Sequence, residues 1–207
     1  MWKLFRRIFW TQKGSGSVPE FQFTSHSPLN GYSKAFAGVM IAEKPECWIT
    51  SISIPENGKA PLQAALLAGF KLQIPEMGRA TTSGFANAYL LGMREKQWFL
   101  VSRSPLSKQA SDGLKTNAYL TDQSDNWGVL SVSGAQSRAV LARICPVDLH
   151  KAKFPIGNVV RTLMAHQGVI IYRQGDDSFR LLVPSSSARS FVQVLEAAAI
   201  SALGEKQ

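Results

Sequence analysis

The sequence has few charged side chains for a chain of its size. Asp, Glu, Lys and Arg make up 18% of the 207 residues, against about 25% in an ordinary soluble domain, while 45% of the residues are hydrophobic. The hydrophobic content excludes wholesale disorder, because a chain of this length can bury a core as one domain or as two small lobes. We interpret the scarcity of charge as typical of a subunit that hides surface against a partner.

Cysteine and histidine are scarce as well. Cys47 and Cys145 lie far apart, and His26, His150 and His166 form no cluster with them. This pattern excludes a secreted disulfide framework and argues against a structural zinc site. We interpret both cysteines as small buried apolar side chains rather than reactive thiols. The sequence also lacks an apolar run of the about 20 residues that a membrane-spanning helix needs, so we expect a cytoplasmic, reducing compartment.

No known catalytic motif occurs in the sequence, which has no nucleophile elbow, P-loop, dinucleotide-binding fingerprint or metal-ligand run. Asp148 and His150 have the spacing of an acid–base pair, but on an irregular connection we interpret them as a local turn or cap. Asp176 and Asp177 are interpreted as turn formers in a Gly-Asp-Asp hairpin turn. We therefore predict no catalytic, cofactor-binding or metal-binding residue in this chain.

The aromatic and basic residues of the expected strands allow two interpretations each. Trp48, Trp98 and Trp127 lie on or beside strands, where they either belong to the core or anchor an interface. Arg161 and Arg173 fall on facing strands of the C-terminal half, where they could hold an anion or a partner's carboxylate. Their alternation with apolar neighbours favours solvent-facing side chains with contacts at a rim.

Positive charge is concentrated at the start of the chain. The formal net charge is +9, and residues 1–17 hold four cations and no acid, so the rest of the chain carries +5. Residues 1–10, MWKLFRRIFW, place apolar and basic side chains on opposite sides of a helix, and a Gly-Ser linker follows. This tail indicates packing on a partner, contact with a membrane surface through residues 1–13, or an added tag. The other cations are dispersed singly, which does not indicate nucleic-acid binding.

The remaining chain alternates strand-like and helix-like segments. The order strand–helix–strand–strand occurs twice, which predicts an α+β fold of two related, ferredoxin-like lobes. We divide the chain into a tail and linker at 1–25, an N-terminal lobe at 26–127 and a C-terminal lobe at 128–207, together one compact unit. The expected strands are 48–54, 86–93, 97–102, 117–122, 128–133, 159–165, 169–173 and 179–183. The expected helices are 60–70, one beginning near Ser104 and Pro105, 135–144 and 188–203.

Two of these helices have clear patterns. The first presents Leu62, Leu66 and Phe70 on one stripe, which we expect to be buried. The serines at 185–187 are expected to cap the last helix. Its inward face is predicted to consist of Phe191, Val194, Leu195 and Ala198.

Several motifs follow one another in the C-terminal half. They are L-x-V-S-G at 130–134, C-P-x-D-L-H at 145–150, F-P-x-G at 154–157, Thr162-Leu163, and D-D-x-F-x-L-L-V at 176–183. Earlier in the chain, Leu-Leu-Gly at 90–92 and Trp-Phe-Leu at 98–100 form a hairpin pattern, and Ser-Pro-Leu stands at 27–29. In these motifs the chain resembles the gamma subunit of heterotetrameric sarcosine oxidase over most of residues 26–200, most densely in the second half.

This resemblance implies a fold similar to the folate-binding domain of the aminomethyltransferase, or T-protein, of the glycine cleavage system. It implies alpha, beta and delta subunits as partners, with FAD, FMN, NAD and tetrahydrofolate on the larger partner subunits and zinc on delta. The gamma subunit of this family carries no catalytic residue that could be transferred. The implied function is a non-catalytic subunit that supports assembly and stability of a flavoenzyme oxidising an N-methylated or secondary amino acid.

A second function remains open, that of a stand-alone folate-binding, T-protein-like transferase or repair factor. Such a protein needs a central cavity with a carboxylate for the pterin ring and basic groups for the glutamate tail. Asp122, Asp148 and Arg161 are candidates, although no motif places them together.

Overall fold

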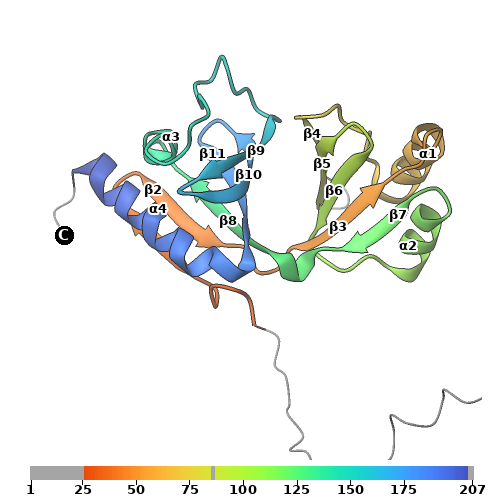
Figure 1. The fold of residues 1–207 in the computed structure, drawn as a ribbon, viewed down its shortest axis with the longest axis horizontal. Helices are drawn as coiled ribbons and strands as arrows, with labels where there is room; N and C mark the ends of the chain where they lie inside the picture. Colours follow the sequence, from red (N-terminus) through yellow and green to blue (C-terminus); the bar gives the residue numbers. More distant parts are fainter. Residues whose placement is uncertain (1–25, 85–86, 205–207) are drawn as a thin grey trace, which may run out of the picture.

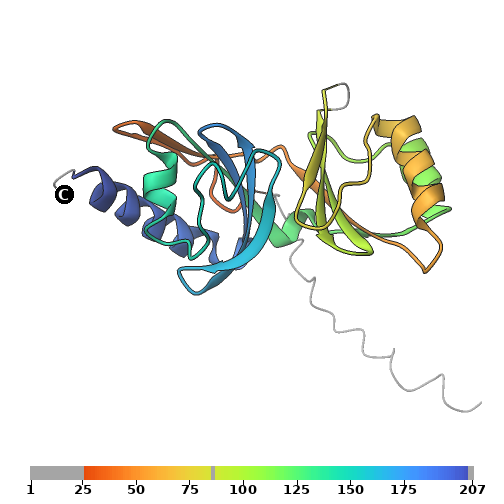
Figure 2. The same ribbon diagram turned by 90° about the horizontal axis from the view of Figure 1, so that it is seen from above.

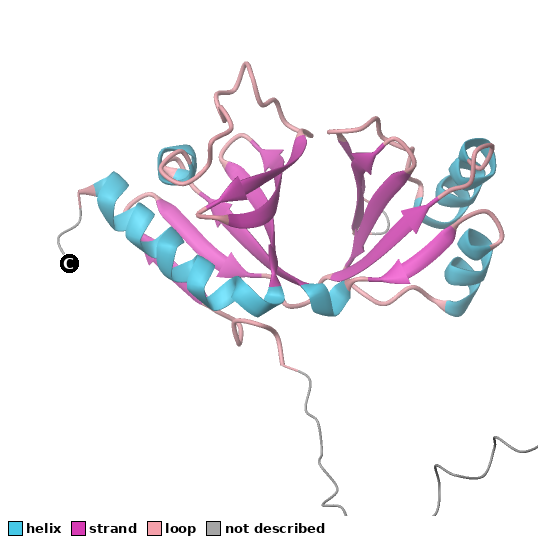
Figure 3. Cartoon of the chain, viewed as in Figure 1, coloured by secondary structure: helices cyan, strands magenta, loops and turns pink. Residues whose placement is uncertain are grey.

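The computed structural model describes residues 26–84 and 87–204. They form four layers, in which two antiparallel sheets face each other and helices cover their outer sides (Figures 1, 2 and 3). The predicted α+β class with two sheets is confirmed. The basic amphipathic tail predicted within residues 1–25 lies outside the described residues. Within the described part of the chain, no helix has the length and apolar character needed to cross a bilayer.

The first sheet has the strand order β4-β5-β6-β3-β7. Without β4, this is the interleaved order of a ferredoxin-like fold, in which α1 and α2 connect the strands and lie on one face. The predicted strands at 48–54, 86–93, 97–102 and 117–122 are confirmed within a few residues, whereas β4 was not predicted. The bounds are β3 Trp48–Ser53, α1 Lys59–Phe70, β4 Ala80–Ser83, β5 Ala88–Arg94, β6 Gln97–Ser102, α2 Lys108–Lys115 and β7 Tyr119–Asp122.

The second sheet has a different order, β1-β2-β8-β11-β10-β9. Its last three strands form a meander that places β11 between β10 and β8, so this sheet does not repeat the strand order of the first. The hairpin β1–β2, which the division at residue 127 assigned to the N-terminal lobe, pairs with β8 in this sheet. The bounds are β1 Ser33–Phe36, β2 Val39–Glu43, β8 Trp127–Ser133, α3 Ser137–Leu141, β9 Val159–Met164, β10 Gln167–Gly175, β11 Ser178–Pro184 and α4 Ala188–Leu203. Short 3-10 turns, η1 Ser124–Asn126 and η2 Ser185–Ser187, precede β8 and α4.

Two helices begin or end differently from the prediction. Helix α2 begins three residues after the expected position, because Ser107 rather than Ser104 accepts the capping hydrogen bond, from the amide of Ala110. Helix α3 is half as long as predicted. Beyond its last residue the amides of Arg143 and Ile144 bond three residues back rather than four, as in a tightened helix end, and Pro146 follows.

Helix α4 packs on the second sheet through the apolar face that the sequence predicts, except at one residue. Phe191, Leu195 and Ala198 are buried, but Val194 is 37% exposed, and the inward face instead includes Val192 and Ala199. The prediction that the preceding serines cap this helix is wrong, because no side chain caps it.

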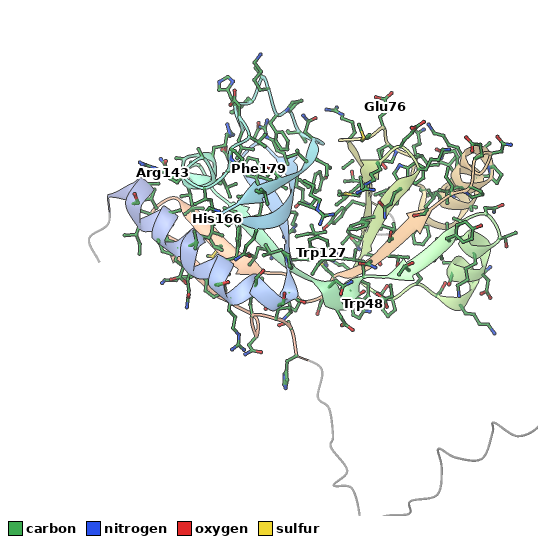
Figure 4. The ribbon with its side chains drawn as sticks, viewed as in Figure 1. Trp48, Glu76, Trp127, Arg143, His166 and Phe179 are labelled. Carbon is green, nitrogen blue, oxygen red and sulfur yellow. The ribbon has the colours of Figure 1, made fainter. Side chains whose placement is uncertain are left out.

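Three apolar cores fill the spaces between the layers. One lies between the first sheet and its helices, and another lies between the second sheet and α3 and α4. A third core lies between the two sheets, where side chains fill the space and Trp127 lies near its base (Figure 4). Its buried members are Ile49, Leu91, Phe99 and Val101 from the first sheet and Val129, Val159, Ile170, Tyr172 and Leu182 from the second. This inter-sheet core fixes the position of the cleft described below.

The outer strands β4 and β9 bring the two sheets together at one edge. The amide of Ala80 donates to the carbonyl of Gly157 at 2.8 Å, and the amide of Val159 donates to the carbonyl of Gly78 at 2.8 Å. Arg79 and Asn158 form a bridge between these segments. We call this contact the edge junction.

Candidate functional site

A cleft opens beside the inter-sheet core, with a cavity volume of about 520 Å³. This volume lies within the range of about 300–1,000 Å³ that small-molecule sites occupy. The connection between β2 and β3 forms one wall, and β4, β5, β6, β10 and β11 form the others. We call it the inter-sheet cleft. The side chains that determine its chemistry are Glu43, Lys44, Cys47, Tyr89, Arg103 and Arg180.

Arg180 and Tyr89 approach the cleft from opposite sheets. Arg180 lies on β11 directly beside Tyr172 of β10. The ring of Tyr172 meets the ring of Tyr89, on β5, with their centroids 5.3 Å apart. The Nη1 atom of Arg180 and the hydroxyl of Tyr89 are both buried and have no hydrogen-bond partner. The cleft therefore contains two polar groups whose hydrogen-bonding capacity is unused.

Burial keeps the weakly acidic groups of the cleft protonated. It raises the pKa of the Tyr89 hydroxyl, an effect that the nearby charge of Arg180 only partly opposes. Burial also raises the pKa of the Cys47 thiol, against the lowering effects of Arg180, Arg103 and Lys44. Both groups are consequently neutral at neutral pH and act as donors rather than as bases or nucleophiles.

The carboxylates of the cleft do not balance its positive charge. Glu43 is buried and already accepts hydrogen bonds from the amides of Leu29 (3.0 Å) and Gly31 (2.6 Å) and from the hydroxyl of Ser27 (2.9 Å). Glu46, the other carboxylate in the wall, is exposed, and three cations face the same space. The inter-sheet cleft therefore offers donors and positive charge. This chemistry is suited to holding an anion.

The residue pairs considered for catalysis have structural partners. The carboxylate of Asp148 accepts from the amide of His150 at 2.9 Å, as a turn cap does, and both residues are exposed. Asp177 forms an ion pair with Arg138, while Asp176 contacts Arg173 at 3.3 Å. Among the residues that the structure describes, no group of three His, Cys, Asp or Glu side chains could hold a metal ion.

The structure confirms the solvent-facing interpretation for Arg161 but corrects it for Arg173, the other arginine considered in the C-terminal half. Arg173 is not solvent-facing but 2% exposed, and its guanidinium donates to the carbonyls of Phe154, Gly175 and Asp176. These hydrogen bonds hold the irregular segment before β9 and the β10–β11 hairpin, so the guanidinium is engaged by its own chain. Arg161 is exposed and lies over the ring of Trp127 at 5.8 Å.

The tryptophans and cysteines have largely the expected environments. Trp98 is buried and donates to the carbonyl of Pro75 at 3.1 Å, and Trp127 meets Phe99 edge to face between the sheets. Trp48 is half-buried and lines a second hollow next to the inter-sheet cleft. Cys145 is buried, as predicted, whereas Cys47 is only half-buried and lines the inter-sheet cleft. Burial raises the pKa of its thiol.

Sequence reasoning did not identify Tyr89 and Arg180. The alternation around Phe179 and Arg180 correctly assigns the arginine to the face opposite the buried phenylalanine. In a single sheet that face would meet solvent, and only the second sheet turns it into the wall of a cleft. The residues considered for a folate site, Asp122, Asp148 and Arg161, do not line this cleft.

Comparisons with known proteins support the resemblance seen in the sequence. The chain is 32% identical over 126 residues to the sarcosine oxidase subunit gamma of Arthrobacter sp., covering 60% of this chain and 61% of that protein. It is 35% identical over 65 residues to the subunit gamma of Corynebacterium sp. (strain U-96), covering 31% and 32%. The matched segments thus span less than two thirds of these gamma subunits. The predicted similarity to this family is confirmed.

Solved structures share the fold. A chain of the heterotetrameric sarcosine oxidase from Corynebacterium sp. U-96, solved in complex with pyrrole 2-carboxylate, matches with a TM-score of 0.72 at 21% identity, covering 86% of this chain and 95% of that one. The glycine cleavage system aminomethyltransferase T from Bartonella henselae matches with a TM-score of 0.59 at 16% identity, covering 83% of this chain and 56% of that one. The sequence profile of the family described as GCVT N-terminal domain matches residues 85–204. Because this match extends over more than half of the sequence, the chain belongs to the GCVT N-terminal domain family.

Proposed function

We propose that this chain is the gamma-type subunit of a cytoplasmic, heterotetrameric, sarcosine-oxidase-like flavoenzyme that oxidises an N-methylated or secondary amino acid. Its role is to support assembly and stability of the complex. The observation that carries the proposal is the 32% identity to a sarcosine oxidase subunit gamma over 126 residues. The proposed partners are alpha, beta and delta subunits, which would hold FAD, FMN, NAD and tetrahydrofolate.

The distribution of exposed apolar side chains supports an assembly role. Met77 and Ile156 are 68% and 50% exposed and flank the edge junction, and Leu163 on the outer strand β9 is 65% exposed. Large apolar side chains at this level of exposure are favourable where a partner covers them. A partner subunit would therefore bury the edge junction and the free side of β9.

Co-expression with alpha, beta and delta chains of the sarcosine oxidase type from the same organism tests the proposal. We expect the tagged chain to elute with flavin absorbance in one complex, and we expect omission of the chain to lower the yield and melting temperature of that complex. The double variant Met77→Ser/Ile156→Ser should weaken co-elution. The control variant Tyr119→Ser changes a 70% exposed side chain on the far strand β7 and should leave co-elution unchanged.

Two results would contradict the proposal. One is elution of the chain alone while the flavoprotein chains form a stable, active complex without it. The other is equal loss of co-elution with Tyr119→Ser and with the double variant, which would remove the assignment of the interface to the edge junction.

Membership of the GCVT family favours a second candidate function, a stand-alone folate-binding transferase or repair factor. Calorimetry of the purified chain with tetrahydrofolate tests it, because binding to a folate site in the free chain would give measurable heat and raise the melting temperature. The absence of both would exclude this candidate and leave the assembly role unaffected.

A further inference from the structure

Arg180 is a cation whose neighbours leave it without a counter-ion. Among the described residues, none of the carboxylates forms an ion pair with its guanidinium, and its Nη1 atom is buried without a hydrogen-bond partner. Arg173, the buried arginine of the second sheet, shows the contrast, because backbone carbonyls satisfy its guanidinium. Buried polar atoms are normally hydrogen-bonded, so the unpaired Nη1 atom of the half-buried Arg180 at the wall of a cleft indicates a missing acceptor.

Tyr89 provides an independent second observation from the opposite sheet. Its hydroxyl is also buried and unpartnered, and it lies close enough for the charge of Arg180 to affect its pKa. Burial keeps this hydroxyl protonated, so that it is available as a donor. Two donors from two sheets thus lie at the wall of one cleft, and neither has a hydrogen-bond acceptor.

The remaining wall favours a compact organic anion. Lys44 and Arg103 add positive charge at the cleft, whereas the carboxylate of Glu43 is already occupied by its own loop. Pro45, Ala88 and Val101 add apolar surface beside the ring of Tyr89. A volume of about 520 Å³ accommodates a small molecule.

We propose that the inter-sheet cleft binds a small organic carboxylate with a flat or ring-shaped apolar part. Its carboxylate pairs with the guanidinium of Arg180 and accepts from the hydroxyl of Tyr89. The planar donor fork of arginine matches the two oxygens of a carboxylate, and the apolar part of the ligand lies along the Tyr89 ring. This binding site does not depend on the proposed place of the chain in a flavoenzyme complex.

Calorimetry of the purified full chain with benzoate, at low ionic strength, tests the site. Benzoate should bind saturably at one site and raise the melting temperature, and benzamide, its uncharged isostere, should not bind. Arg180→Met should weaken benzoate binding by about tenfold or more, because it removes the charge-assisted hydrogen bonds. Arg143→Met removes an exposed arginine elsewhere, and should leave binding within about twofold of the unchanged chain.

Tyr89→Phe keeps the proposal testable if Arg180→Met does not fold. It removes only the unpartnered hydroxyl and should weaken benzoate about threefold without lowering the melting temperature of the free chain. The proposal is overturned if benzoate and benzamide bind alike, if inorganic sulfate binds as tightly as benzoate, or if Arg143→Met weakens binding as much as Arg180→Met.

Discussion

In both sheets, the helix after the first central strand leads into an irregular segment that returns to an outer strand. In the first sheet this segment consists of residues 71–79 and connects α1 to β4; in the second sheet it consists of residues 142–158 and connects α3 to β9. The two segments meet at the edge junction. The first segment is held by neutral groups: Gln63 accepts from the amide of Ile74 at 2.8 Å, and Trp98 donates to Pro75. The second is held by the buried charge of Arg173.

This difference shows how segment length determines the choice of anchor. The short segment stays beside its helix, where the amide side chain of Gln63, about two turns before the helix end, can reach its backbone. In the longer segment the carbonyl of Phe154 lies away from any helix, and the guanidinium of Arg173 joins it to the carbonyls of Gly175 and Asp176 in the β10–β11 hairpin. The variants below test whether the two anchors differ in strength as they differ in chemistry.

The largest losses in the free energy of unfolding are expected for substitutions at two glycines where another backbone segment approaches closely. An added Cβ would overlap the carbonyl of Glu76 at Gly92, in the first sheet, and the carbonyl of Gly38 at Gly134, in the second. Gly134 also has φ of 120°, which other residues rarely adopt, whereas Gly92 does not have a left-handed φ. We expect Gly134→Ala to cost about 4 kcal/mol and Gly92→Ala about 2 kcal/mol, measured by urea unfolding. A larger loss for Gly92→Ala would show that the first segment is the more rigid one.

Substitutions of the two anchoring side chains, Arg173 and Gln63, should give the next largest losses in the free energy of unfolding. Arg173→Met should lower the free energy of unfolding by about 3 kcal/mol, because it leaves buried carbonyls unpaired. Gln63→Leu, which removes the neutral anchor, should cost about 1–2 kcal/mol in the same urea experiment. Equal losses would mean that the charge of Arg173 adds nothing to its hydrogen bonds.

Smaller losses in the free energy of unfolding are expected at the serines that precede α2 and α4, at opposite ends of the molecule. Ser107 caps α2 through the amide of Ala110 at 3.2 Å, whereas the hydroxyl of Ser187, before α4, donates to the carbonyl of Pro184. Thermal unfolding should show a loss of about 1 kcal/mol for Ser107→Ala and a loss of a few tenths, about 0.3 kcal/mol, for Ser187→Ala. The reverse order would show that η2 depends on its serine more than α2 does on its cap.

These pairs also show which parts of the fold the sequence could predict. The stripe of Leu62, Leu66 and Phe70 and the alternation of β3 depend on neighbouring residues, so local patterns were sufficient for them. The cap of α2 and the short α3 were misjudged, because several serines compete as caps and helix length depends on tertiary contacts. The hairpin β1–β2 was missed because its first strand is exposed and lacks a hydrophobic pattern.

The candidate site was harder to predict than the fold. Lys44, Tyr89 and Arg180 come from segments far apart in sequence, and each alone has the pattern of an ordinary strand or loop residue. Arg173 and Arg180 have similar sequence surroundings, yet one is satisfied by carbonyls and the other is unpartnered. What separates them is the face of the second sheet on which each lies, and that depends on the packing of the first sheet against it.

The last comparison concerns two carboxylates with lowered pKa values, Glu196 beside the second sheet and Asp122 in the first sheet. Hydrogen bonds from Lys34 (2.8 Å) and Tyr32 (2.6 Å) lower the pKa of Glu196 and tie β1 to α4, whereas Ser124 lowers the pKa of Asp122 within one turn. A carboxylate with a lowered pKa stabilises the fold above its unfolded pKa. That contribution is lost as the pH falls through the folded pKa.

Urea unfolding between pH 6 and pH 3 should therefore show a shallower decline for Glu196→Gln than for the unchanged chain. The difference should be about 0.5 kcal/mol, since Lys34 is half exposed and its ion pair is screened by solvent. Asp122→Asn should alter the decline less, because its partner is a neighbouring residue that can keep the same contact in the unfolded chain. If Asp122→Asn had the larger effect, local turns rather than the tie between β1 and α4 would set the acid stability of the molecule.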